Sequence, residues 1–155
     1  MSVRFHNQGL SGKLAEKITR GKRRVADFTQ RMLPAEADVL APDGSEVRLL
    51  VTASRGSMAS FRLPPGAVTK AVRHASVEEV WYITGGRGRM WRKSDRDESV
   101  VEVTPGMSID IPLGVAFQFR ADGDAPIDIV GVTMPPWPGP EEAIFVDGTW
   151  EPTVD

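Results

Sequence analysis

Short alternating runs of apolar and polar residues make up most of the chain from Val25 onward. The runs are rich in β-branched and aromatic residues and are separated by Pro, Gly and Asp, a pattern typical of strands joined by tight turns. We expect strands over residues 47–53, 58–63, 68–74, 77–84, 88–93, 100–103, 108–111, 115–120 and 127–134. No long helical pattern interrupts them, which predicts an all-β sandwich or barrel rather than a parallel α/β sheet.

The two ends of the chain depart from this pattern. Leu10, Leu14 and Ile18 recur four residues apart, which predicts a short amphipathic helix. Residues 135–140 contain four prolines, and proline cannot donate to the ladder of an interior strand. We therefore expect three parts: a basic arm over 1–24, a β-barrel over 25–134, and a proline-rich strap over 135–155 that packs on the barrel. The strap has four large apolar residues as expected anchors, Trp137, Ile144, Phe145 and Trp150.

Composition narrows the classes of function. The 155 residues carry a net charge of −2, with 41% hydrophobic residues and no cysteine, which indicates one globular domain without disulfides or thiolate sites. Neither a membrane-spanning run nor a secretory leader pattern is present, so we expect a cytoplasmic protein that does not bind membranes. The arm over 1–24 is basic but too short for a helix-turn-helix domain. We expect it to dock on the body or on a second subunit, and expect no nucleic acid partner.

Two stretches in the middle of the chain carry glycine and ligand-type residues at fixed spacings. The first runs from Gly66 to Gly86 and contains His74 and Glu79. The second holds Gly106, Pro112, Gly114 and Phe117. Their order and spacing resemble the paired motifs of the cupin superfamily, G-x5-H-x-H-x3-4-E-x6-G and G-x5-P-x-G-x2-H-x3-N. The resemblance covers roughly residues 45–134 and implies a single jelly-roll β-barrel of the cupin type that pairs as a homodimer.

In cupins, three histidines and the glutamate of these motifs bind one metal inside the barrel. The corresponding positions here are Val72, His74, Glu79 and Phe117, so the resemblance implies that two of four ligands are retained. The other histidine of the chain, His6, lies in the arm. We therefore expect no resident cofactor. A divalent metal held by His74 and Glu79, with further ligands from the arm or a neighbour, is the alternative.

Strand alternation predicts what surrounds this pair. The resemblance implies that the motif histidines and the glutamate point inward, and side chains two residues apart share a face. The inner face should then hold a largely apolar set with one imidazole and one carboxyl. We expect a ligand pocket lined by Lys70, Val72, Trp81, Phe117 and Phe119, with His74 and Glu79 as catalytic residues. Tyr82 has the parity of the outer face. The cupin-fold sugar-nucleotide epimerases that work without metal use a tyrosine acid beside a histidine base, so this chain departs from their design.

Three functions remain open on the sequence. The first is a small-molecule cupin, either a binding protein or a metal-independent isomerase, epimerase or lyase that uses His74 and Glu79. The second is a metal-dependent, dioxygenase-like cupin with an incomplete or shared site. The third is a structural or regulatory barrel without chemistry, whose arm or strap binds a partner.

Overall fold

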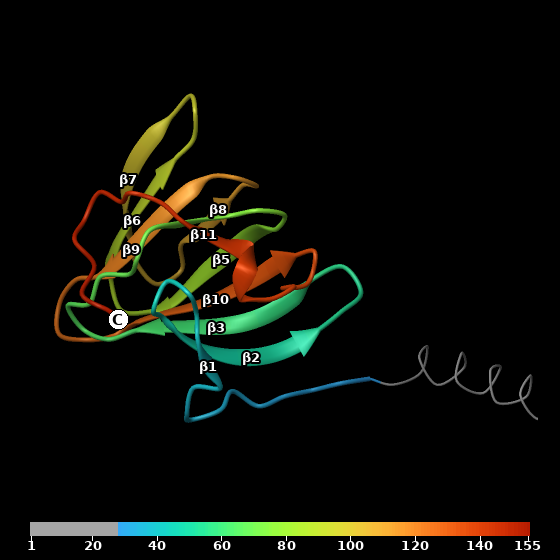
Figure 1. Cartoon of the computed structure of the whole chain (residues 1–155). Coiled ribbons are helices and arrows are strands. Elements are labelled where there is room, and N and C mark those ends of the chain that lie inside the picture. The colour runs from blue at the N-terminus through green and yellow to red at the C-terminus, as the bar shows by residue number, and fades with distance from the viewer. Residues whose placement is uncertain (1–27) are drawn as a thin grey trace, which may run out of the picture. The chain divides into compact units, whose positions relative to one another are not determined.

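The computed structural model describes residues 28–155, and these fold into two antiparallel sheets (Figure 1). The predicted arm over 1–24 lies outside the described residues. One sheet has the strand order β1-β2-β3-β10-β5-β8 and the other β11-β4-β9-β6-β7. The strands are β1 (Val39–Leu40), β2 (Glu46–Thr52), β3 (Ser57–Leu63), β4 (Val72–His74), β5 (Glu78–Gly85), β6 (Gly88–Lys93), β7 (Glu98–Val103), β8 (Ser108–Ile111), β9 (Ala116–Ala121), β10 (Ile127–Met134) and β11 (Ala143–Phe145).

The predicted all-β jelly roll is confirmed, and the predicted strands correspond to β2 through β10. One strand is shorter than expected, because β4 begins only at Val72. The pairing with β9 is interrupted just before it: Val68 and Thr69 still bond to β9, but the N–H of Lys70 donates to the carbonyl of Asp43 instead. Among the described residues, no helix has the length and apolar character needed to span a membrane.

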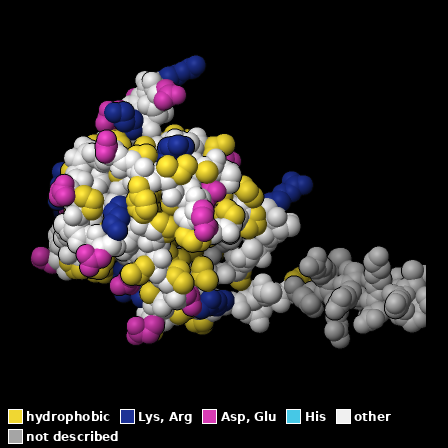
Figure 2. All heavy atoms as spheres, viewed as in Figure 1, with side chains coloured by type: hydrophobic (Ala, Val, Ile, Leu, Met, Phe, Trp, Pro, Cys, Tyr) yellow, Lys and Arg dark blue, Asp and Glu magenta, His cyan; other side chains and the backbone are white. Residues whose placement is uncertain are grey.

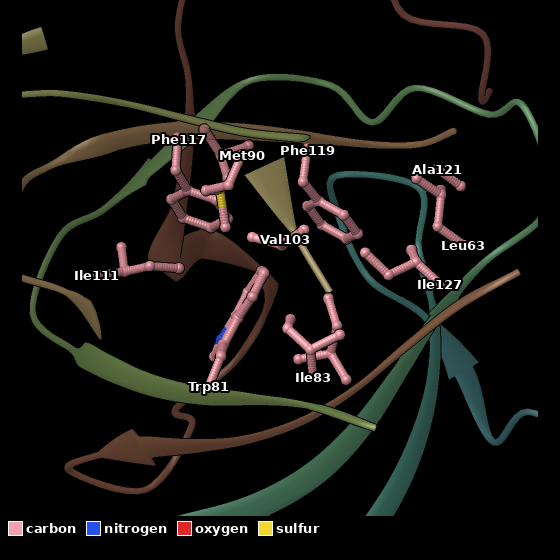
Figure 3. Packing of buried hydrophobic residues seen from close by; sticks show 12 residues of the cluster. Leu63, Trp81, Ile83, Met90, Val103, Ile111, Phe117, Phe119, Ala121 and Ile127 are labelled. Atoms are coloured by element: carbon pink, nitrogen blue, oxygen red, sulfur yellow. The ribbon is translucent and has the colours of Figure 1, made fainter. Parts of the chain in front are cut away.

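The core lies between the inner faces of the two sheets. Along β5 and β10 every second side chain is buried, as the period of two for a strand requires. The largest buried apolar side chains meet there from both sheets, and Figure 3 shows the rings of Trp81, Phe117 and Phe119 pointing toward one another. Fully burying a side chain of this size stabilises the fold by roughly 1.5–3 kcal/mol, so this packing dominates the stability of the barrel.

The C-terminal strap (residues 135–155) folds back on the barrel and becomes part of it. After the prolines, a 3-10 helix (Pro140–Glu142) leads into β11, which pairs with β4 and extends the five-stranded sheet. Sequence reasoning missed this strand because three residues give too short a pattern. Phe145, expected as an anchor, is instead 59% exposed, since β11 is an edge strand.

Gln118 of β9 holds the end of the strap. Its amide nitrogen donates to the carbonyls of Thr69 and Trp150, both at 2.8 Å, and its amide oxygen accepts from the backbone N–H groups of Thr149 and Trp150. The side chain is fully buried. All four hydrogen-bonding positions of the amide are therefore used, and three of them hold residues 149 and 150 of the strap.

Replacing Gln118 with alanine should lower the free energy of unfolding by about 3 kcal/mol, because buried backbone groups lose their partners. Urea denaturation of the Gln118→Ala protein measures this. The exposed Gln30 offers a matched control, since Gln30→Ala should change stability by less than about 0.5 kcal/mol. Equal, small effects of both substitutions would contradict the fastening role.

Candidate functional site

The turn between β4 and β5 positions the two candidate catalytic residues. His74 is the last residue of β4, and Glu79 is the second residue of β5. The carboxylate of Glu142 accepts hydrogen bonds from the backbone N–H groups of Ser76 and Val77 and from the hydroxyl of Ser76. The strap thereby fixes the turn, and with it the spacing of His74 and Glu79.

His74 and Glu79 approach each other closely in the buried interior. Nδ1 of His74 lies 3.2 Å from Oε1 of Glu79, and the two side chains are 6% and 4% exposed. The other carboxyl oxygen of Glu79 accepts a hydrogen bond from the indole N–H of Trp81. Nδ1 of His74, however, has no hydrogen bond of acceptable geometry. The contact is therefore a close approach of two groups rather than a formed ion pair.

Aromatic rings enclose the imidazole of His74 on two sides. Its centroid lies 5.2 Å from that of Phe117 and 5.2 Å from that of Trp137, both in edge-to-face arrangements. Trp81 in turn contacts Phe117 and Phe119 edge-on, at 5.7 and 5.2 Å. In the space-filling view no histidine side chain of the described part appears on the face shown (Figure 2). The polar pair is therefore embedded in hydrocarbon.

This environment favours the neutral form of both groups. Burial lowers the pKa of His74 to about 4, although the nearby Glu142 carboxylate acts in the opposite direction. Burial raises the pKa of Glu79 to about 7, against the opposing effect of the hydrogen bond from Trp81. Between these two values the pair consists of a neutral imidazole and a protonated carboxyl. A protonated Glu79 can donate to Nδ1 of His74, which a carboxylate cannot do.

The structure brings most of the predicted site residues together. His74, Glu79, Trp81 and Phe117 form one cluster, which Phe119 joins through Trp81. Val72 is also buried in the core, paired with Phe117 across β4 and β9. Tyr82 is 51% exposed on the other face of β5.

Lys70 does not belong to this cluster. Its ammonium lies over the ring of Phe145, 5.9 Å from the centroid, and its side chain lines a surface hollow of about 580 Å³ together with Gln118 and Trp150. The prediction of Lys70 as a pocket residue is corrected for a physical reason. It assumed that strand alternation extends back to residue 70, whereas β4 begins at Val72.

Two residues at the site were missed by sequence reasoning. Trp137 was expected only as an anchor of the strap, and Glu142 was not singled out, yet one contacts the imidazole and the other fixes the turn beside it. More than sixty positions separate His74 from either residue in the chain. No local signal predicts such a contact, because it depends on the path of the strap.

The side chains around His74 and Glu79 in the described part of the chain do not fit a metal. Within residues 28–155, no group of three or more His, Cys, Asp or Glu side chains is placed to hold an ion. Val72 and Phe117, at two of the positions expected for ligands, supply only hydrocarbon. The indole N–H of Trp81 occupies one oxygen of Glu79, whereas catalytic zinc and non-haem iron sites use about three protein ligands.

Comparison with known proteins identifies the family. The family model of the cupin domain matches residues 59–133. An uncharacterised protein of Methanocaldococcus jannaschii is 30% identical over 119 residues, which cover 71% of this chain and 92% of that protein. The chain belongs to the cupin superfamily.

Solved structures agree with this cupin fold. A variant of the oxalate decarboxylase of Bacillus subtilis superposes with a TM-score of 0.65 at 16% identity, over 78% of this cupin and 33% of the decarboxylase. An uncharacterised protein with a double-stranded β-helix domain from Klebsiella pneumoniae gives 0.57 at 13% identity, over 79% and 98%. This cupin therefore spans about a third of the decarboxylase, and at these identities the likeness concerns the fold.

The raised pKa of Glu79 predicts a pH-dependent effect of Glu79→Gln. Between pH 4.5, the ordinary value for Glu, and about 7, the unfolded chain releases this proton while the folded protein retains it. The unfolded state then binds fewer protons, so this group makes stability fall as pH rises through that window, by about 3 kcal/mol in total. The glutamine of the variant cannot ionise and still offers an acceptor to Trp81. The variant should therefore gain stability over the wild type progressively from pH 4.5 to 7, with no further gain above it.

Denaturation of both proteins across pH 4.5–9 measures the difference. His74, Asp43 and Glu142, the other titratable groups acting on this pair, are present in both proteins and largely cancel. A stability difference that does not change with pH would mean that Glu79 ionises at its ordinary pKa.

Proposed function

We propose that this chain is a metal-independent cupin that binds a small organic ligand beside His74 and Glu79. The observation that carries this proposal is an imidazole and a carboxyl that lie 3.2 Å apart, almost completely buried, in a largely apolar interior. Nδ1 of His74 has no other hydrogen-bond partner there, so only a protonated Glu79 can satisfy it. Burying two such groups is costly, and a function for the pair explains why they are kept.

The protonation states suit proton transfer. At neutral pH Glu79, with a pKa of about 7, can give or take a proton, whereas the imidazole of His74, with a pKa of about 4, stays uncharged and serves as its hydrogen-bond partner. A buried carboxyl of this acidity, oriented by an imidazole, allows removal of a proton next to a carbonyl and its return at another position. Isomerase, epimerase and lyase reactions are of this kind.

A ligand would reach the pair from the side of Trp137. This ring is half-buried, whereas Trp81 and Phe117 on the inner side are almost completely enclosed. The backbone N–H of Trp137 donates to the hydroxyl of Ser57, and its ring contacts the imidazole. Displacement of this one indole would expose His74 while the sheets stay in place.

Indole N–H signals in NMR spectra report on ligand binding at this position. We expect small carboxylic acids and carbonyl compounds, with oxalate and formate among the probes, to shift the signals of Trp81 and Trp137 in a saturable way. Oxalate and formate are chosen because both appear with the decarboxylases of similar fold. The signals of Trp91 and Trp150 should stay in place, because neither ring contacts His74.

Two variants test where the probe binds. His74→Ala should abolish the shifts of Trp81 and Trp137, because it removes the polar group that would anchor the probe. Lys70→Ala, at the surface hollow, should leave them unchanged. Shifts that persist in the His74→Ala protein, or the absence of saturable shifts with every probe, would sink ligand binding at this site.

Metal content distinguishes this proposal from the metal-dependent alternative. Elemental analysis of the full chain, purified untagged and without chelator, should give far less than one Mn, Fe, Ni or Zn per chain. One metal per chain would mean that His74 and Glu79 recruit further ligands, and it would replace the proposal with a metal-dependent cupin.

A barrel without chemistry is the second candidate. The contact of Trp81 with Phe117 and Phe119 supports it, because these rings fill the space in which a ligand would otherwise lie. The probe experiment separates the two candidates. The homodimer implied by the resemblance and the cytoplasmic location stay predictions.

A further inference from the structure

One carboxyl group connects the two polar side chains of the site with an indole. Oε2 of Glu79 accepts the indole N–H of Trp81, and Oε1 of the same group lies 3.2 Å from Nδ1 of His74. Glu79 and Trp81 are two residues apart on β5, so their side chains share the inner face of the sheet. The two oxygens thus have different partners on opposite sides of the carboxyl.

We propose that Trp81 is a positioning residue, whose indole N–H fixes one oxygen of Glu79 so that the other faces His74. This inference rests on the proposed function of the pair. The last torsion of a glutamate side chain is broad, so a buried carboxyl without this bond could turn both oxygens away from the imidazole. Trp81 would not touch the reacting atoms; it would act through Glu79.

The indole is itself held in place on several sides. The ring of Phe61 lies 5.5 Å from it at an interplanar angle of 33°, and Phe117 and Phe119 meet it edge-on. Gly131 of β10 lies directly opposite Trp81 in the register of the sheet. A Cβ at Gly131 would come within 2.7 Å of Cε2 of Phe61, 2.9 Å of Cδ1 of the indole and 3.1 Å of its Nε1. The absence of a side chain at Gly131 therefore leaves space for both rings, and with it for the present position of the N–H.

The same contact opposes metal binding by Glu79. A carboxylate ligand needs a free oxygen directed at the ion, but here one oxygen is taken by the N–H and the other faces the imidazole. The hydrogen bond from Trp81 also lowers the pKa of Glu79 against the stronger effect of burial. Loss of the N–H should therefore change the orientation of the Glu79 carboxyl and raise its pKa.

Trp81→Phe in the full chain tests the proposal, because phenylalanine keeps an aromatic ring and lacks the N–H. NMR titration of carboxyl-labelled glutamate, with the Glu79 signal assigned from Glu79→Gln, gives the midpoint of Glu79, and ring nitrogen shifts report on His74. We expect the pKa of Glu79, read as the midpoint of its titration, to be higher in Trp81→Phe than in the wild type. The chemical shifts of the His74 ring nitrogens should also change. Asp43 and Glu142, the carboxyls acting on the pair, remain in place.

Trp91 provides a matched control. Its indole N–H donates to the carboxyl of Glu98 at 2.8 Å, away from the site, and this bond lowers the pKa of Glu98. Trp91→Phe makes the same chemical change. It should raise the midpoint of Glu98 and leave those of Glu79 and His74 as they are.

The outcomes separate the possible failures. A folded Trp81→Phe protein with unchanged Glu79 and His74 titrations would overturn the positioning role and leave Trp81 as core packing. If Trp81→Phe does not fold, Gly131→Ala provides a second test, because its methyl group crowds both Phe61 and the indole. It should move the titrations of Glu79 and His74; no movement there overturns the proposal equally. Should the titrations move while the wild type binds no small-molecule probe, the positioning role stands and the proposed function fails.

Discussion

Exclusion of water from the space between the two sheets is the constraint on which the site depends. The inner faces of β5, β9 and β10 supply aromatic and branched side chains that pack against one another. The interior therefore has a low effective dielectric constant. A carboxyl and an imidazole placed there must find partners or become neutral. The shifted acidities of Glu79 and His74 and the indole bond to Glu79 both follow from this single condition.

The strap contacts the barrel at several points, some of them beside the polar pair. Glu142 satisfies the N–H groups of the β4–β5 turn, Gln118 fastens residues 149 and 150, and Trp137 lies against His74. These contacts join a segment late in the chain to the two strands that carry the polar pair. The geometry of the pair therefore depends on the strap as well as on the sheets. Movement at Trp137 would couple access to the pair with the packing of the strap.

Most of the site could be predicted from the sequence, and so could the fold. Local periodicity indicated the all-β class, and the resemblance to the cupin motifs indicated the jelly roll and the pair of His74 and Glu79. The period of two places His74, Glu79, Trp81 and Phe117 on inner faces, and turn residues separate the strands. Periodicity fails where a strand stops early, which is why Lys70 was assigned to the wrong surface. It also cannot find Trp137 or Glu142, whose positions depend on the pairing of β11 with β4. Alternation of faces also cannot predict the hydrogen bond from Trp81 to Glu79, because this bond depends on the rotamers of the two side chains.

His74 and Glu79 have a different electrostatic environment here from that of the corresponding ligands in a metal-binding cupin. A metal would supply positive charge to the carboxylate and to the ring nitrogen, making their burial favourable. In this chain Val72 and Phe117 remove the remaining ligands, and an indole N–H provides only a partial positive charge. That partner is too weak to keep Glu79 ionised against burial, so the carboxyl takes up a proton near neutral pH. Burial without a compensating positive charge thus moves the pKa values of Glu79 and His74 in opposite directions, toward the neutral form of each.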